Sequence, residues 1–126
     1  MTKILEEILE RSEQSGVESA IVLIPAQFQY DPKSHSKTNP WIIAGGEVRE
    51  EWLSEETEIQ KKMKLWALSV DVPLLDLTPV FREEIKSNKS LNWELDGHWN
   101  DLGHQVAAKA IASWLVDQQV FSFIKE

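Results

Sequence analysis

Two short apolar runs constrain the fold of this chain more than any other feature. The runs "SAIVLIP" (19–25) and "VPLLDL" (72–77) show no alternation of apolar and polar residues, and each follows a segment with helical periodicity. Such runs are typical of strands that are buried on both faces, as in a parallel sheet. Because connections between parallel strands are right-handed crossovers, we expect both strands to lie in one sheet of an α/β fold.

The segments around these runs predict helices. Residues 2–15 carry an apolar stripe that ends at Gly16, and Ser54 is placed to cap a helix over residues 55–69. Thr78 and Pro79 predict the cap and first position of a short helix. A last helix is expected over residues 102–117. The faces expected to pack inward are Ile4, Leu5, Ile8 and Leu9 in the first helix, Ile59, Met63, Trp66 and Val70 in the second, and Leu102, Val106, Ala110, Ile111 and Trp114 in the last.

Two parallel strands cannot form a stable sheet alone. The polar segment 29–40 predicts a loop, and "WIIAGG" (41–46) fits either a strand or a packed loop. A chain of 126 residues has the length of one domain. We therefore expect either that "WIIAGG" and another segment supply further strands, or that further strands come from a longer domain or from a second chain.

Composition excludes several classes of function. The formal net charge of −8 disfavours nucleic acid and anionic membranes as partners, because both require a basic surface. Acidic residues interrupt the N-terminal 16 residues, which therefore do not resemble a signal peptide, and no apolar run could span a bilayer. The default expectation is a cytoplasmic protein. The chain contains no cysteine, which excludes disulfides, thiolate metal sites and thiol catalysis.

The most specific motif is "ELDGHWNDLGHQVAAKAIASWL" (94–115), which holds two of the three histidines at the start of the last predicted helix. Together with "AIVLIPAQFQY" and "VPLLDLTPVF", it resembles the C-terminal part of an SGNH (GDSL-type) hydrolase. The resemblance covers most of residues 1–126 in chain order. It implies a flavodoxin-like three-layer α/β/α sandwich with a parallel sheet, of which this chain is the C-terminal half.

The resemblance implies a catalytic dyad in "DGH". His98 would be the general base that takes a proton from a serine hydroxyl, and Asp96 would orient the imidazole. Many members place the acid three residues before the histidine, where this sequence has Leu95. The arrangement therefore resembles the D-x-H branch of polysaccharide O-acetyltransferases and esterases. The implied substrate is an acyl ester such as an acetylated carbohydrate, and the chemistry needs no cofactor.

The nucleophile block of the family is not found in this sequence. No Gly-Asp-Ser triplet follows an apolar strand, and the oxyanion block G-x-N-D is also absent. The serines of the chain are expected on polar helix faces, in loops or at helix ends, as are Ser12, Ser19, Ser34 and Ser69. If the resemblance holds, a missing N-terminal segment or a second chain supplies the serine, and the chain alone is inactive. Exposed apolar surface on such a half-domain would favour a homodimer.

Other interpretations of the same residues stay open. One is a non-catalytic α/β module. A more distant one is a metal-dependent hydrolase, with ligands drawn from Asp96, His98, Asp101 and His104, although their spacing matches no common site.

Structural roles are also available to the neighbours of the motif. Asn100 or Asp101 could cap the last helix, and His104 falls in its first turn. Trp93 and Trp99 flank the Asp96–His98 dyad, where packing in the core is their default role and lining of an acyl or sugar site is the alternative. Asp76 ends the second strand, where capping of the next turn is expected.

Overall fold

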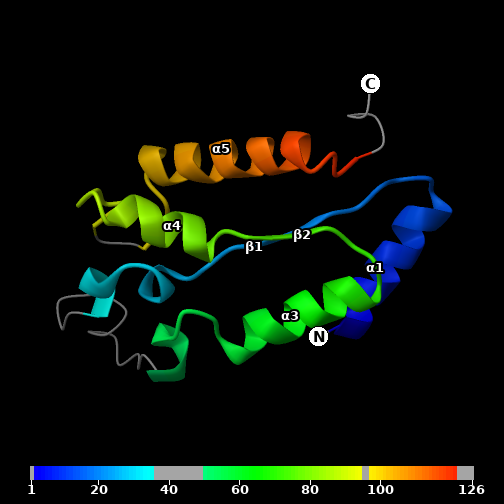
Figure 1. Ribbon diagram of the computed structural model, residues 1–126, viewed down its shortest axis with the longest axis horizontal. Coiled ribbons are helices and arrows are strands. Elements are labelled where there is room, and N and C mark those ends of the chain that lie inside the picture. Colours follow the sequence, from blue (N-terminus) through cyan, green and yellow to red (C-terminus); the bar gives the residue numbers. More distant parts are fainter. Residues whose placement is uncertain (1, 36–49, 95–96, 122–126) are drawn as a thin grey trace.

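The computed structural model of the chain describes residues 2–35, 50–94 and 97–121. Within these ranges the chain is a mixed α/β structure with four α-helices and a two-stranded sheet (Figure 1). The helices are α1 (Thr2–Gln14), α3 (Glu58–Ser69), α4 (Thr78–Ile85) and α5 (Asp101–Asp117), and the strands are β1 (Ile21–Leu23) and β2 (Leu74–Asp76). Short 3₁₀ turns occupy Gln27–Gln29, Pro32–His35 and Glu50–Leu53.

The two predicted strands pair in parallel, as expected. Ile21 lies opposite Leu74 and Leu23 lies opposite Asp76. Figure 1 shows α4 and α5 on one side of this pair and α1 and α3 on the other. Both strands are therefore placed between helices, which accounts for the apolar residues of β1 and for Leu74 and Leu75 of β2.

β1 has one paired edge within the described residues. The Ile21 N–H donates to Pro73 O over 2.8 Å, and Leu23 O accepts from the Leu77 N–H over 3.1 Å. Because successive residues of a strand direct their backbone groups to opposite sides, the N–H and C=O of Val22 point away from β2. A further strand of this sheet would pair along that edge or along the outer edge of β2. The segment "WIIAGG" lies outside the described residues, so its role stays a prediction.

The main core lies between the sheet, α4 and α5. Leu77 and Phe81 are fully buried, and Tyr30, Leu91 and Ala107 pack around them. Of the face predicted for the last helix, Leu102, Val106, Ala110 and Ile111 contact this cluster. The prediction for that helix is therefore confirmed, with its start at Asp101.

The start of α3 differs from the prediction. Ser54 does not cap it; the Ser54 hydroxyl donates to the carbonyls of Glu51 and Glu56. Thr57 is the cap instead, since its hydroxyl accepts from the Gln60 N–H while the Gln60 side chain accepts from the Thr57 N–H over 2.8 Å. This reciprocal capping box satisfies the backbone N–H groups of both Thr57 and Gln60.

The buried face of α3 is also shifted from the prediction. Met63 is buried as expected, but its buried neighbours are Gln60 and Ala67, while Ile59 is 61% exposed and Val70 is 38% exposed. The periodicity did not reveal this, because the inward position is held by a glutamine whose amide bonds to buried polar groups.

The junction of β2 and α4 is held by Asp76. Its carboxylate accepts from the Thr78 N–H over 3.0 Å, as expected for a residue that caps this turn. α4 begins at Thr78, with Leu77 at the N-cap position, so the prediction of Thr78 as the cap is wrong. Lys64 Nζ and Gln60 Nε2 also contact the carboxylate, at 3.1 and 3.0 Å. Burial alone would raise the pKa of Asp76, but hydrogen bonds from Thr78 and Lys64 outweigh burial and lower it.

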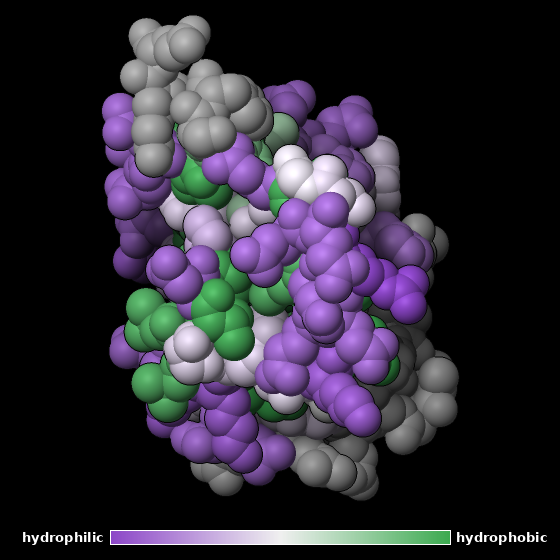
Figure 2. Space-filling model, turned by 90° about the vertical axis from the view of Figure 1, so that its right-hand side faces the viewer, coloured by the Kyte–Doolittle hydropathy of each residue, from purple (hydrophilic) through white to green (hydrophobic). Residues whose placement is uncertain are grey.

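The first helix packs less than expected. None of its residues is buried, and Ile4 and Ile8 of the predicted stripe are 66% and 53% exposed. Trp66 of α3 donates to Glu6 across the two helices over 3.0 Å. Exposed apolar side chains also occur on α3, where Leu68 is 79% exposed. Figure 2 shows hydrophobic side chains at the surface among hydrophilic ones on one side of the molecule.

Candidate functional site

The loop that carries His98 is a short antiparallel turn in front of α5. Asn92 and Trp99 form an isolated bridge, and the Trp93 N–H donates to the His98 carbonyl over 2.9 Å. Asn100 then caps α5, since its side chain accepts from the Gly103 N–H over 3.0 Å. Asn100, one of the two predicted caps, is thereby confirmed, and the cap fixes where the loop ends and the helix begins.

Gly97 allows this loop to turn. Its φ of +73° lies in the left-handed region, where a side chain is strained. Glycine therefore suits the middle position of "DGH". Asp96 lies outside the described residues, so its predicted hydrogen bond to His98 stays a prediction. The His98 side chain is exposed, as a base that must reach a substrate requires.

The loop after β1 holds the His98 loop in place. The Tyr30 hydroxyl donates to Asn92 Oδ1 over 2.6 Å, and Asn92 Nδ2 donates to the Gly97 carbonyl over 2.7 Å. Both Tyr30 and Asn92 are buried, and burial raises the pKa of Tyr30 to about 12. The loop after β1 and the residue next to His98 are therefore joined by two successive hydrogen bonds. Sequence reasoning missed both Tyr30 and Asn92. The available signal was the single tyrosine of the chain in the loop after a predicted strand, because a buried tyrosine needs a partner for its hydroxyl.

Trp93 and Trp99, the two tryptophans beside the predicted Asp96–His98 dyad, have different environments. Trp99 packs edge-on against Phe81 with ring centroids 4.9 Å apart, which confirms its core role. Trp93 is 54% exposed, so the core role expected for it is wrong. The His104 ring packs against Trp99 from the first turn of α5, with centroids 5.6 Å apart.

Two serines named in the sequence are engaged by the backbone. The Ser34 hydroxyl donates to the Asp31 carbonyl and the Ser69 hydroxyl donates to the Trp66 carbonyl, each over 2.7 Å. These are local turn and helix contacts of the kind that serine commonly makes. Neither serine has the Gly-Asp context of a nucleophile.

Metal binding finds no support in the part of the chain that the structure describes. No group of three or more histidine, aspartate or glutamate side chains there is arranged to hold an ion. Asp96, one of the ligands considered, lies outside that part. The helices of the same ranges include none with the length and apolar character needed to cross a bilayer.

Comparison with known proteins gives no relative for this chain. No protein-family model, no curated protein and no solved structure matches it.

Proposed function

We propose that this chain carries the base and its orienting acid for an SGNH-type ester hydrolase or O-acyltransferase with a flavodoxin-like α/β/α domain. His98 is the general base and Asp96 is the residue that positions it. The substrate is an acyl ester, for which an acetylated carbohydrate is the candidate that the D-x-H pattern favours. No cofactor takes part. The serine and the oxyanion donors come from a polypeptide segment outside residues 1–126.

One observation carries the proposal. The exposed His98 follows Gly97, whose carbonyl is joined through Asn92 to Tyr30 in the loop that follows the carboxyl end of β1. Ligands of open α/β sheets bind at the carboxyl ends of the strands. A base for attack on a bound ester belongs at this edge, where it is both exposed and held by a buried anchor.

The proton path follows from the two roles. As the serine oxygen attacks the ester carbonyl carbon, His98 Nε2 takes the hydroxyl proton, and the imidazolium is stabilised by Asp96 beside Nδ1–H. The tetrahedral intermediate collapses, and His98 returns that proton to the departing alcohol. Water or an acceptor alcohol then attacks the acyl-serine and loses its proton to His98. His98 returns that proton to the departing serine oxygen, which restores the serine hydroxyl and the neutral imidazole.

The tautomer of His98 tests the assignment on the chain as it stands. An orienting carboxylate at Nδ1 holds the neutral ring in the Nδ1–H form. Long-range ¹H–¹⁵N spectra of the full chain should show this form for His98, and Asp96→Asn should reduce its population. His104 in the same spectrum is the internal control and should not change. An unchanged His98 tautomer in the variant would show that Asp96 does not orient the imidazole, and the assignment of Asp96 to the site would be wrong.

Ester hydrolysis supplies a second readout. Without a nucleophile and oxyanion donors, the chain loses the covalent route, and a single oxyanion donor is worth about 3–4 kcal/mol of transition-state stabilisation. Turnover of p-nitrophenyl acetate should therefore equal that of His98→Ala. Turnover that disappears in the variant would place a nucleophile within these 126 residues.

A non-catalytic α/β module is the second candidate. It is favoured by the engagement of Ser34 and Ser69 with backbone carbonyls and by the lack of a Gly-Asp-Ser block. The tautomer experiment separates the two candidates, because a module without catalysis has no need to fix the imidazole of His98.

A further inference from the structure

A pocket of about 580 Å³ opens at the carboxyl end of β1, beside the Gln27–Gln29 turn. Its walls come from the end of β1, the Gln27–Gln29 and Glu50–Leu53 turns and the first turn of α3. The volume falls within the range of about 300–1,000 Å³ that is common for small-molecule sites. No described residue of the His98 loop lines it, so it is a separate feature of the fold.

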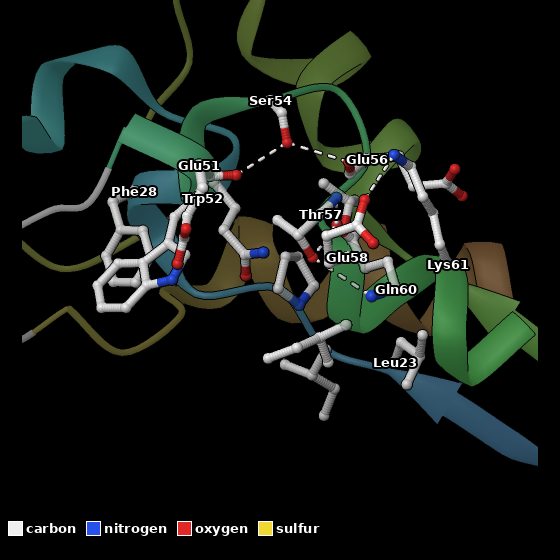
Figure 3. Close-up of a pocket in the computed structure, with 15 residues that line it drawn as sticks. Leu23, Phe28, Glu51, Trp52, Ser54, Glu56, Thr57, Glu58, Gln60 and Lys61 are labelled. Atoms are coloured by element: carbon white, nitrogen blue, oxygen red, sulfur yellow. Dashed lines mark hydrogen bonds and ion pairs between the residues drawn. The ribbon is translucent and has the colours of Figure 1, made fainter.

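The pocket has an apolar wall with an aromatic pair. Phe28 and Trp52 stack with ring centroids 5.2 Å apart and an angle of 24° between the rings. Figure 3 shows this pair at one end of the pocket and Lys61 at the opposite end. Ile24 and Ile59 complete the apolar surface, although they are 67% and 61% exposed. Covering them with an apolar ligand would remove these side chains from water.

The deep polar wall of the pocket is already satisfied. Gln60 accepts from Thr57 and donates to Thr78 Oγ1 over 2.8 Å and to Asp76 over 3.0 Å. Among the described residues no buried side-chain nitrogen or oxygen is without a partner. Because the polar groups of this wall already bond to one another, a ligand would contact the wall by shape and would find no unpaired hydrogen-bonding group there.

Charge sets the sign of the ligand. Three carboxylates, those of Glu51, Glu56 and Glu58, line the pocket. Two of them are ion-paired: Lys61 Nζ lies 2.9 Å from Glu58 Oε1, and Lys64 Nζ lies 2.6 Å from Glu56 Oε1. The three carboxylates exceed these two ammonium groups by one, so the local charge at the rim is negative, as is the net charge of −8 on the whole chain. An ammonium near aromatic faces and carboxylates is attracted by both.

We propose that this pocket binds a small organic cation, an ammonium group carried on an aliphatic or aromatic body. The body packs against Phe28, Trp52 and Ile59, and the ammonium lies among the carboxylates of the rim. This site stands independently of the ester chemistry proposed for His98.

The experiment compares three ligands of equal chain length on the full protein. Octylammonium, 1-octanol and octanoate are titrated against the chain at pH 7 by calorimetry and by displacement of the neutral dye N-phenyl-1-naphthylamine. We expect one saturable site, with octylammonium binding most tightly and octanoate least. Equal affinities, the reverse order or no saturable binding would overturn the proposal.

Two pairs of variants locate the binding. Glu58→Gln removes a rim charge and should weaken octylammonium about threefold, as expected for one partly screened charge, with octanol unchanged. Glu83→Gln is its matched control, since Glu83 is also exposed and paired with a lysine three residues later on α4. Ile59→Gln should weaken both ligands, whereas Leu68→Gln, at an exposed position of the same helix outside the pocket, should not. If the two variants of either pair changed the affinity equally, binding would reflect general attraction to an acidic or apolar surface, and the proposed site would be wrong.

Discussion

The Tyr30 hydroxyl donates to Asn92 Oδ1 over 2.6 Å, although 62 residues separate the two in the chain. Both side chains are buried, at 3% and 4% exposure. Asn92 Nδ2 in turn donates to the Gly97 carbonyl, which lies next to His98. The position of the His98 loop therefore depends on a tyrosine in the loop after β1.

Tyr30→Phe should destabilise the fold and loosen this loop. The change keeps the ring against Phe81, where it packs edge-on, but leaves Asn92 Oδ1 buried without its donor. The expected loss is about 1–3 kcal/mol in the free energy of unfolding, measured with urea. A double-mutant cycle with Asn92→Ala isolates the pair. Additive effects of the two changes would show that the hydrogen bond contributes nothing measurable.

The ionisation of Tyr30 should be visible directly, because it is the only tyrosine in the chain. Burial raises the pKa of Tyr30 to about 12, above the usual value of about 10. The raised pKa means that the contribution of this group to stability is complete below pH 10 and is lost as pH rises toward 12. Tyrosinate absorbance at ~295 nm should rise with a midpoint near that pKa. The decline in unfolding free energy between pH 10 and 12 should be shallower in Tyr30→Phe; parallel curves for the two proteins would contradict the burial argument.

Features with local causes could be predicted from the sequence. The parallel strands at 21–23 and 74–76 followed from unbroken apolar runs, and the Asn100 cap followed from its place before a helical stripe. Both depend on residues close together in the chain. The resemblance of the "DGH" motif indicates chemistry, but the described structure places only His98 of its dyad.

Features that depend on distant contacts could not be predicted. The burial of Gln60 in place of Ile59 requires Asp76 and Thr78, which lie on another element. The Tyr30–Asn92 bond joins two loops that no periodicity relates. The pocket beside β1 likewise forms only when the Glu50–Leu53 turn brings Trp52 against Phe28.

Gly103→Ala tests the contact of α5 with the loop before it. A Cβ at this position would lie 2.3 Å from the Leu91 carbonyl oxygen and 3.0 Å from Trp99 Cβ. Although alanine favours helices over glycine by about 1 kcal/mol, the clash should win and destabilise the protein by about 1–3 kcal/mol. Thermal melting against Ser113→Ala, an exposed change on the same helix, provides the comparison. An unaltered or raised melting temperature for Gly103→Ala would mean that the helix does not approach Leu91 this closely.

Asp76→Asn tests the junction between β2 and α4. Asp76 has a side chain only 7% exposed, and the change removes its charge from Lys64 and weakens the cap at Thr78. We expect a loss of about 2–3 kcal/mol at pH 7. Because the pKa of Asp76 is lowered by folding, its contribution is present above the unfolded value of about 4 and disappears as pH falls through the folded pKa. The difference between the two proteins in urea unfolding should therefore shrink below pH 4. Glu7→Gln, at an exposed position of α1, is the control for a lost charge; a difference that stays constant from pH 7 to pH 2 would contradict the role of the carboxylate.

The exposed apolar surface leads to a prediction about association. Ile8 of α1 and Leu68 of α3 are 53% and 79% exposed, and Val22 directs its backbone groups away from the only strand that pairs with β1 in the described ranges. Open strand edges and apolar patches favour contact between molecules. Size-exclusion chromatography with light scattering should show dimers or larger species at tens of micromolar. The double change Ile8→Glu with Leu68→Glu should shift the protein toward monomer, while Gln105→Glu, at an exposed polar position of α5, should not. A monodisperse wild-type monomer with one cooperative melting transition would show that the sheet needs no further strand, and the assignment of the chain to half of a larger domain would then be wrong.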